Sequence, residues 1–458
     1  MSKEEIHVVM LPWSAFGHLI PFLELSIALA KSGIHVSFIS TPKNIKKLPK
    51  IPPNLSTLID FIPIPLPKLD PNLLPESSEA TVDIPGEKIQ YLKLACDFLQ
   101  KPVKKILAEK SPNWIIVDFS HHWAVDISRD LNIPIILYYV FNGAAAVFFG
   151  AQQFLVGDGQ KRLTPESWTF PPKWVDFPSK VAFKKHEADL MQPGVFGQNA
   201  SGMSDASRLA KILRSCKAIA ILHAKTTGKP VFPVGFLPPE KIREESKKTV
   251  KEVPIFQWLD EQNPSSVVFV GFGSECKLNK EQIHEIAYGV ELSGLPFLWA
   301  LRKPDWANDE SEILPPDFLH RTAGRGVVHI GWAPQREILG HPSVGGSLFH
   351  AGWGSIIETL QYGHCLVFLP FIIDQPLNAR LLVEKGLGIE VEKAEDGSFS
   401  RNEIAKSLRK AMVLEEGEEF RVRARDAANG IFGDEKLHDS YVQKFVEYLE
   451  NGVGQQED

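Results

Sequence analysis

The chain has 458 residues, and its 44% hydrophobic and 23% charged content is ordinary for a globular protein that can bury a sizeable core, with room for two domains. A net charge of −6 gives no support for a nucleic-acid partner. The four cysteines are scattered without metal-ligand spacing, so a disulfide scaffold and a cysteine metal site are excluded and a reducing, cytoplasmic setting is expected.

No membrane segment is expected. The first apolar run, Ile6–Trp13, is short and follows Glu4 and Glu5, which is unlike a signal peptide. The longest apolar region, Gly143–Val156, contains two glutamines and is too short to span a bilayer.

Strand and helix patterns alternate through the first half of the chain. Alternation of this kind predicts a parallel, doubly wound sheet. Strands are predicted over Ile6–Pro12, Ile34–Ser40, Trp114–Phe119 and Ile133–Val140, with helices over Pro21–Ser32 and His122–Leu131.

The same alternation restarts after a Lys- and Glu-rich stretch, Glu240–Glu252. Two Rossmann-like halves facing a cleft are therefore expected. The predicted domains are 1–240, a linker at 241–253 and 254–439, with the C-terminal helix of about 440–458 packing back on the first domain. The predicted elements are strands Ser265–Gly271 and Pro296–Arg302, and helices Lys280–Ser293, Asn402–Met412, Glu418–Asn429 and Ser440–Glu450.

In open α/β sheets, ligands bind beyond the carboxyl ends of the strands. His18 lies in the first predicted strand-to-helix loop, and Asp118 ends a later strand. An imidazole beside a carboxylate is a competent general base for an alcohol, although a loop histidine is more often structural. The neighbouring His121 and His122 lack ligand partners at metal-binding spacing, and the wall of an apolar pocket is the favoured role.

The segment His350–Ser355 follows a strand and opens a helix predicted to start at Ser355. A helix start offers unpaired N–H groups and a positive dipole end to a diphosphate. Alternatively, Ser355 and Glu358 form a capping box that closes the helix locally. The nearby Trp332 and the pair Asp374–Gln375 favour a ligand site.

Two of these motifs are weak in isolation. Asp374 could simply cap a helix that begins near Pro376, and Gly271–Ser274 could be an ordinary tight turn. The chain has no P-loop motif and no G-x-G-x-x-G after its first strand, so neither a P-loop nucleotide nor a dinucleotide coenzyme is favoured. A D-x-D motif is also absent from the sequence, which argues against a metal-dependent transferase.

The 44 residues from Trp332 to Gln375 resemble the plant secondary-product glycosyltransferase box, and the resemblance extends from the Pro12–His18 opening to the C-terminal helix. It implies a family 1 UDP-dependent glycosyltransferase with a GT-B fold, acting by inversion without a metal or other cofactor. Glucose is the expected sugar, with His18 as general base assisted by Asp118. The resemblance assigns donor binding to Ser274, Trp332, Ala333, Gln335, His350, Trp353, Gly354, Ser355, Glu358, Asp374 and Gln375.

Within this donor set each part of the nucleotide sugar has its own residues by resemblance. Trp332 stacks on uracil and Gln335 contacts the base or ribose. Glu358 binds the ribose hydroxyls. The diphosphate is assigned to His350, Ser355 and Ser274, and the sugar to Trp353, Asp374 and Gln375.

Details of the chain are similar to the subgroup that extends the sugar chains of terpenoid or flavonoid glycosides. The expected partners are a UDP-sugar and a hydrophobic glycoside, bound by a monomer. Alternatives are a UDP-rhamnose-dependent transferase, a nucleotide-sugar epimerase or an inactive UDP-sugar-binding protein. The predicted acceptor pocket consists of Phe119, His122, Trp123, Phe141, Phe148 and Phe149.

The sequence departs from the family pattern at two places. Gly354 stands where most members carry Asn, which leaves donor affinity and sugar choice open. The passage Ile221–Pro230 is shorter than usual, which suggests a natural deletion, a splice form or engineering.

Overall fold

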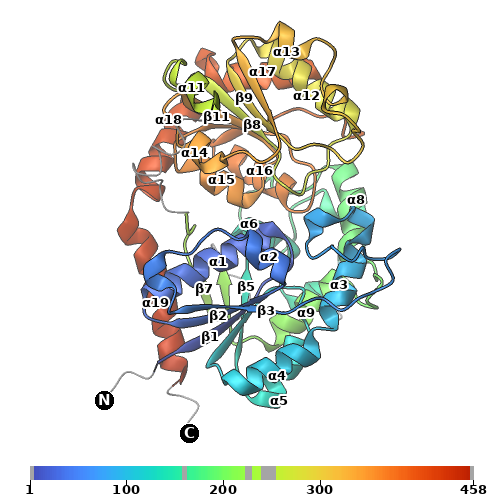
Figure 1. Cartoon of the computed structure of the whole chain (residues 1–458), viewed down its shortest axis with the longest axis vertical. Helices are drawn as coiled ribbons and strands as arrows, with labels where there is room; N and C mark the ends of the chain where they lie inside the picture. Colours follow the sequence, from blue (N-terminus) through green and yellow to red (C-terminus); the bar gives the residue numbers. More distant parts are fainter. Residues whose placement is uncertain (1–4, 157–161, 222–228, 239–253, 454–458) are drawn as a thin grey trace. The chain divides into compact units, whose positions relative to one another are not determined.

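The computed structural model describes residues 5–156, 162–221, 229–238 and 254–453 (Figure 1). The chain forms two compact units. Unit 1 comprises Met1–Ser167, Leu190–Leu237 and Glu435–Asp458, and unit 2 comprises Trp168–Asp189 and Pro238–Asp434. The predicted linker at 241–253 and most of the short passage at 221–230 lie outside the described residues.

Within the described residues, unit 1 contains a seven-stranded parallel sheet in the order β3-β2-β1-β4-β5-β6-β7 (Figure 1). Strand β1 pairs with both β2 and β4. The chain first adds β2 and β3 on one side of β1 and then returns to add β4 on the other side. Ligands of doubly wound sheets bind at such a switch point. The strands are β1 (His7–Leu11), β2 (His35–Ser40), β3 (Ile59–Pro63), β4 (Trp114–Val117), β5 (Ile135–Tyr139), β6 (Ala218–Ile221) and β7 (Val231–Pro233).

Helices cover both faces of this sheet. Leu19, Phe22 and Leu29 of α1 and Phe445 of α19 bury one face, and α4, α5 and α9 bury the other. Helix α19, drawn in red at the end of the chain, contacts α1 and β7 (Figure 1). The helices are α1 (Phe16–Lys31), α2 (Pro42–Lys47), α3 (Ile89–Asp97), α4 (Gln100–Lys110), α5 (Ala124–Leu131), α6 (Gly143–Phe149), α7 (Gln152–Leu155), α9 (Asp205–Ser215) and α19 (Glu435–Val453).

The described part of unit 2 contains a six-stranded parallel sheet in the order β10-β9-β8-β11-β12-β13. Its switch point lies between β8 and β11, which pair directly. The five residues of β8 are all buried, as expected for a central strand covered on both faces. The strands are β8 (Val267–Gly271), β9 (Phe297–Leu301), β10 (Gly326–Ile330), β11 (Val344–Phe349), β12 (Cys365–Phe368) and β13 (Gly388–Glu390).

Helices α12 and α17 pack together on one face of this sheet, and α11 and α14 cover the other. Unit 2 also holds the segment Trp168–Asp189, which includes the start of α8. The helices are α8 (Lys185–Phe196), α11 (Pro254–Asp260), α12 (Lys280–Ser293), α13 (Phe318–Arg321), α14 (Gln335–Leu339), α15 (Trp353–Leu360), α16 (Gln375–Glu384), α17 (Arg401–Met412) and α18 (Glu418–Ala427).

The two doubly wound α/β sheets confirm the predicted fold class, but the starts of four helices were predicted wrongly. Helix α5 begins at Ala124 and not at His122, and α19 begins at Glu435 and not at Ser440. Helix α1 begins at Phe16 and contains Pro21 in its interior, so His18 lies in the first helical turn and not in a loop. Helix α15 begins at Trp353, with Gly352 at the N-cap, so Ser355 is a helical residue. Among the described residues, no helix combines the length and apolar character needed to cross a bilayer.

Candidate functional site

His18 and Asp118 meet at the switch point of unit 1. They follow β1 and β4, the two neighbouring strands at which the order reverses, and the distance between His18 Nδ1 and Asp118 Oδ2 is 2.7 Å. The backbone N–H groups of Trp13 and Phe119 donate to the same carboxylate at 3.0 and 2.7 Å. A carboxylate that accepts from Nδ1–H leaves Nε2 as the proton acceptor.

Aromatic side chains surround the imidazole of His18. Its ring centroid lies 5.7 Å from that of Phe119 and 5.5 Å from that of Phe141. Phe149 extends the group, with its centroid 6.5 Å from that of Phe141. These three phenylalanines are only partly buried, so an apolar acceptor could contact them beside the candidate base.

The other three predicted acceptor residues have different surroundings. Trp123 is 2% exposed within the core of unit 1, and Phe148 is also 2% exposed, with the guanidinium of Arg162 above its ring. His122 Nε2 lies 3.4 Å from the carboxylate of Asp97. Their role in acceptor binding stays a prediction, and the Phe119–Phe141–Phe149 group is the better-placed part of that set.

Asp97 also pairs with a fully buried cation, Arg208 of α9. Two guanidinium nitrogens lie 2.8 and 2.5 Å from the two oxygens of Asp97, and further bonds run to Ser120 O and Ser201 Oγ. Burial acts to raise the pKa of Asp97, but the hydrogen bonds from His122 and Arg208 outweigh it and hold the pKa below its ordinary value.

In unit 2, the imidazole of His350 is enclosed by two glycines at the switch point between β8 and β11. A Cβ added at Gly273 would lie 2.8 Å from His350 Cε1, and one at Gly352 would lie 2.5 Å from His350 Nε2. Gly273 has a φ of +65°, which favours glycine further. Both glycines are therefore required by the position of this ring.

His350 is neutral at neutral pH, since burial lowers its pKa to about 4. A backbone hydrogen bond with Gly271 acts in the opposite direction, to raise the pKa, but burial outweighs it. A neutral imidazole at the carboxyl end of a strand would interact with a ligand by hydrogen bonding and not by charge.

The start of α15 lies directly after His350. Its N-cap residue, Gly352, has no side chain with which to cap the helix, and the first turn contains no acidic residue. Glu358 bonds to Gln335 and does not close a capping box with Ser355 at the helix start. The first N–H groups of a helix have no partner within that helix, so this helix start is a candidate site for an anion.

Gln335 and Glu358 are held together beside an exposed tryptophan. Gln335 Nε2 donates to Glu358 Oε2 at 2.7 Å, and burial raises the pKa of Glu358. Trp332 follows the edge strand β10 and is 92% exposed, more than any other large hydrophobic side chain among the described residues. An indole of this kind is a platform on which a planar ring can stack.

Asp374 and Gln375 end a loop after β12, which is held closed by hydrogen bonds between its backbone and the side chain of Gln375. Gln375 Oε1 accepts from the N–H groups of Phe371 and Ile372, both at 3.0 Å, and Asp374 makes no side-chain cap bond at the start of α16. Ile373 has a φ of +56°, which is rare for a β-branched residue. Backbone strain of this kind gathers at functional sites.

Three further residues contact these loops and were not predicted from the sequence. Asn378 is fully buried and donates to Ala351 O at 3.0 Å and to Asp374 Oδ2 at 2.9 Å, which joins two loops of the site. Arg302 donates to Ser274 O at 2.7 Å. The Cys276 thiol lies 3.6 Å from Gln375 Nε2, and its burial raises its pKa to about 12. Arg302 follows directly after a parallel strand, a signal that could have found it.

The predicted donor residues therefore lie at or beyond the carboxyl ends of the strands in the unit 2 sheet. Ser274, His350, Trp353 and Ser355 lie at the two strands of its switch point, and a Cβ added at Gly354 would meet nothing within 4 Å. Ala333 lies between Trp332 and Gln335. Among the described residues, no group of three or more His, Cys, Asp or Glu side chains is arranged to hold a metal ion.

Comparison with known proteins gives related chains over nearly the full length. Residues 232–416 match the model of the family described as UDP-glucoronosyl and UDP-glucosyl transferase. The chain is 42% identical to UDP-glycosyltransferase 91D1 of Stevia rebaudiana, over 99% of this chain and 94% of that protein. It is 39% identical to the soyasaponin III rhamnosyltransferase of Glycine max, over 98% and 96% of the two chains.

A solved structure is similar over the same length. It is a UDP-glucosyltransferase from Polygonum tinctorium capable of glucosylating indoxyl, in complex with 3,4-dichloroaniline. The two share 25% sequence identity and a TM-score of 0.73, and the match covers 98% of this chain and 100% of the other.

Proposed function

Since the chain belongs to family 1 of the plant UDP-glycosyltransferases, enzymes of GT-B fold that transfer a sugar from a UDP-sugar to a small molecule, we propose that it transfers glucose to a hydroxyl of a terpenoid or flavonoid glycoside. The observation that carries the catalytic part is the 2.7 Å contact between His18 and Asp118 among partly exposed aromatic rings.

His18 Nε2 takes the proton of the acceptor hydroxyl in the proposed reaction, and Asp118 stabilises the imidazolium that forms. The acceptor oxygen attacks the anomeric carbon from the face opposite to UDP, and the bond to the diphosphate oxygen breaks. A single displacement of this kind inverts the configuration. It requires no metal or other cofactor in the proposal, because protein donors offset the leaving-group charge.

Unit 2 supplies the hydrogen-bond donors that stabilise the negative charge developing on UDP. The N–H groups at the start of α15 and the neutral imidazole of His350 are fixed before the ligand arrives. Preorganised donors stabilise developing charge without reorganisation, which is a large term in catalysis. Trp332 would stack on uracil, Glu358 would accept from the ribose hydroxyls, and Asp374 and Gln375 would contact the sugar.

The acceptor class is supported by a relative and by the surroundings of His18. A saponin is a glycoside by definition, and the Glycine max relative is named for rhamnose transfer to one. Its name also favours a second candidate, a UDP-rhamnose-dependent transferase. The aromatic rings of Phe119, Phe141 and Phe149 suit a hydrophobic aglycone, whereas a nucleotide-sugar epimerase needs no such surface.

A donor and acceptor screen tests this proposal. The purified chain is incubated with UDP-glucose or UDP-rhamnose and with flavonoid and terpenoid aglycones or their monoglycosides, and UDP release and product mass are measured. We expect UDP-glucose and a monoglycoside to give a product heavier by one hexose. Faster turnover with UDP-rhamnose than with UDP-glucose would make rhamnose, and not glucose, the transferred sugar. If the chain binds UDP but releases none from either UDP-sugar, it is an inactive binding protein.

Replacing Trp332 with alanine should weaken UDP binding by about tenfold to a hundredfold, since base stacking on an aromatic ring contributes about 1–3 kcal/mol. At 92% exposed, the indole contributes little to folding, so the melting temperature should stay unchanged. Calorimetric titration with UDP measures the effect, and Leu319→Ala, at an exposed position of the same unit, provides the control. An unchanged UDP affinity would remove Trp332 from the site.

A further inference from the structure

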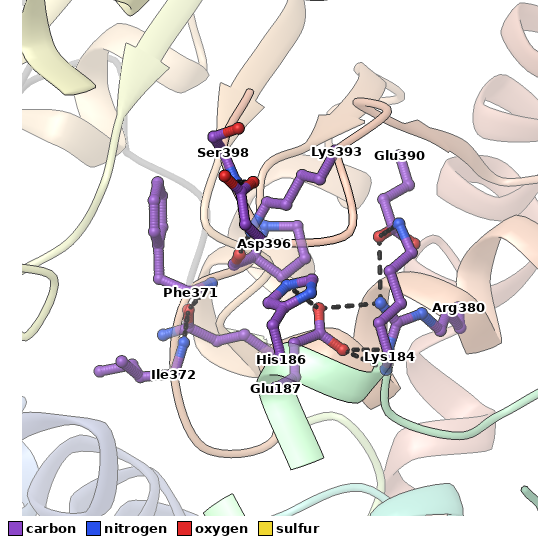
Figure 2. A network of polar contacts seen from close by, with 12 residues as sticks. Lys184, His186, Glu187, Phe371, Ile372, Arg380, Glu390, Lys393, Asp396 and Ser398 are labelled. Carbon is purple, nitrogen blue, oxygen red and sulfur yellow. Dashed lines mark hydrogen bonds and ion pairs between the residues drawn. The ribbon is translucent and has the colours of Figure 1, made fainter. Parts of the chain in front are cut away.

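A network of ion pairs connects the segment Trp168–Asp189, α16 and β13 of unit 2, beside the loop that precedes α16 (Figure 2). Arg380 of α16 binds Glu187 through two nitrogens, at 2.6 and 2.9 Å, and reaches Glu390 of β13 at 3.2 Å. Lys184 Nζ lies 3.0 Å from the same Glu390 oxygen. Glu187 is 4% exposed and Arg380 is largely buried, so these contacts are shielded from solvent.

Lys393 is close enough to Glu187 and Glu390 to interact with their charges, and it contacts the loop Pro370–Gln375. Its ammonium donates to the carbonyl oxygen of Pro370 and lies 4.9 Å from the ring centroid of Phe371. The ring of Phe371 also contacts Phe399 and Phe272, at 5.8–5.9 Å between centroids. Phe272 belongs to the Gly271–Ser274 loop at the switch point. The lysine therefore holds the first two residues of one loop against another.

The same loop ends in the two residues assigned to the donor sugar. From Pro370 to Gln375 it is closed by the bonds from Phe371 N and Ile372 N to Gln375 Oε1. It passes through Ile373 in a left-handed conformation, which costs energy and persists only where the surroundings enforce it. Lys393 contacts this loop at Pro370 and Phe371, the end opposite to Gln375.

We propose that Lys393 is a positioning residue for donor-sugar binding, which fixes the loop Pro370–Gln375 by its bond to Pro370 and its contact with Phe371, with Glu187 and Glu390 as the counter-charges of its ammonium. The inference rests on the proposed function of this loop. Lys393 lies beyond the Trp332–Gln375 stretch from which the donor site was predicted. Because Glu187 is one of its counter-charges, donor binding would also depend on Trp168–Asp189, a segment from the first half of the sequence.

The charges around Lys393 make its effect depend on pH. Burial lowers the pKa of Lys393 from 10.5 to about 8, with Glu187 and Glu390 acting to raise it and Lys184 and Arg380 acting to lower it. His186, next to Glu187, has a pKa lowered below its ordinary value by burial and is therefore uncharged in the alkaline range. As pH rises through about 8, Lys393 loses its charge and its hold on the loop weakens, so donor KM should rise.

Folding stability should move in the opposite direction over the same range. Between about pH 8 and 10.5 the unfolded chain binds this proton and the folded chain does not, so the free energy of unfolding contributed by Lys393 rises with pH. A lysine with only a structural role gives no reason for donor KM to worsen while stability improves.

The test compares Lys393→Met and Lys393→Arg with the wild-type chain, using UDP-glucose and the best acceptor. At pH 7 the methionine variant should raise donor KM about tenfold, the cost of losing one charged hydrogen bond, with kcat changed by less than about twofold. The Kd for UDP alone should stay the same, because UDP carries no sugar. The arginine variant should keep the low KM and lose its rise above pH 8.

Lys406→Met, at an exposed position of α17, serves as the matched control. Equal donor KM in the wild-type and Lys393→Met chains would overturn the proposal, as would a parallel rise in the Kd for UDP. If the methionine variant does not fold, the arginine variant still decides, because a donor KM that changes with pH in the same way in Lys393→Arg and in the wild-type chain contradicts the proposal. Absence of UDP binding and turnover in the wild-type chain would instead overturn the proposed function.

Discussion

Replacing His18 with alanine should lower kcat by about 10³-fold, because a positioned general base contributes about 10²–10⁴ to the rate of proton transfer. Asp118 holds the imidazole with Nε2 free to accept a proton, and no other imidazole among the described residues contacts Asp118 by a hydrogen bond. The Kd for UDP should stay nearly unchanged, since the residues assigned to UDP belong to unit 2.

Initial rates at saturating UDP-sugar and acceptor measure this effect, and UDP titration by calorimetry supplies the second quantity. His320→Ala, an exposed histidine of α13, is the control and should keep full activity. Activity of His18→Ala close to that of the wild-type chain would remove the general-base role from His18.

Replacing Arg208 with alanine should lower the free energy of unfolding of unit 1 by about 3–5 kcal/mol, since removing one partner of a buried ion pair leaves the other charge uncompensated. Arg208 is fully buried, and the bonds that its guanidinium makes to Asp97, Ser120 and Ser201 would all be lost. The same change disturbs Phe119 only indirectly, through Ser120.

Urea unfolding followed by tryptophan fluorescence measures this loss, and the transition of unit 1 must be separated from that of unit 2. Arg214→Ala on the same helix is the matched control, because Arg214 is exposed and should change stability by less than about 0.5 kcal/mol. Equal midpoints for Arg208→Ala and the wild-type chain would show that the ion pair is not needed for folding.

The sheets of both units could be predicted because buried parallel strands are continuous apolar runs. The predicted strands Ile6–Pro12 and Ser265–Gly271 differ from β1 and β8 by no more than two residues at either end. The start of α1 was missed because proline usually opens a helix, whereas Pro21 lies inside this one. Local propensity could not show that five residues before Pro21 are helical.

The placement of the predicted donor residues after parallel strands could be derived from the Trp332–Gln375 stretch, but the side chains that support these loops could not. Asn378 and Lys393 act through bonds to backbone carbonyl oxygens at Ala351 and Pro370, and such bonds leave no spacing pattern in the sequence. Glu187 is nearly 200 residues from its partner Arg380. Pairing across that separation follows from the fold and from no local signal.

The anomeric configuration of the product tests the central claim most directly. The chain is incubated with UDP-α-glucose and a glycoside acceptor, and the coupling of the new anomeric proton is measured by NMR. A single displacement assisted by His18 and Asp118 predicts a β-linked glucose and one UDP released for each bond formed. An α-linked product, or transfer that persists unchanged when His18 is replaced by alanine, would contradict it.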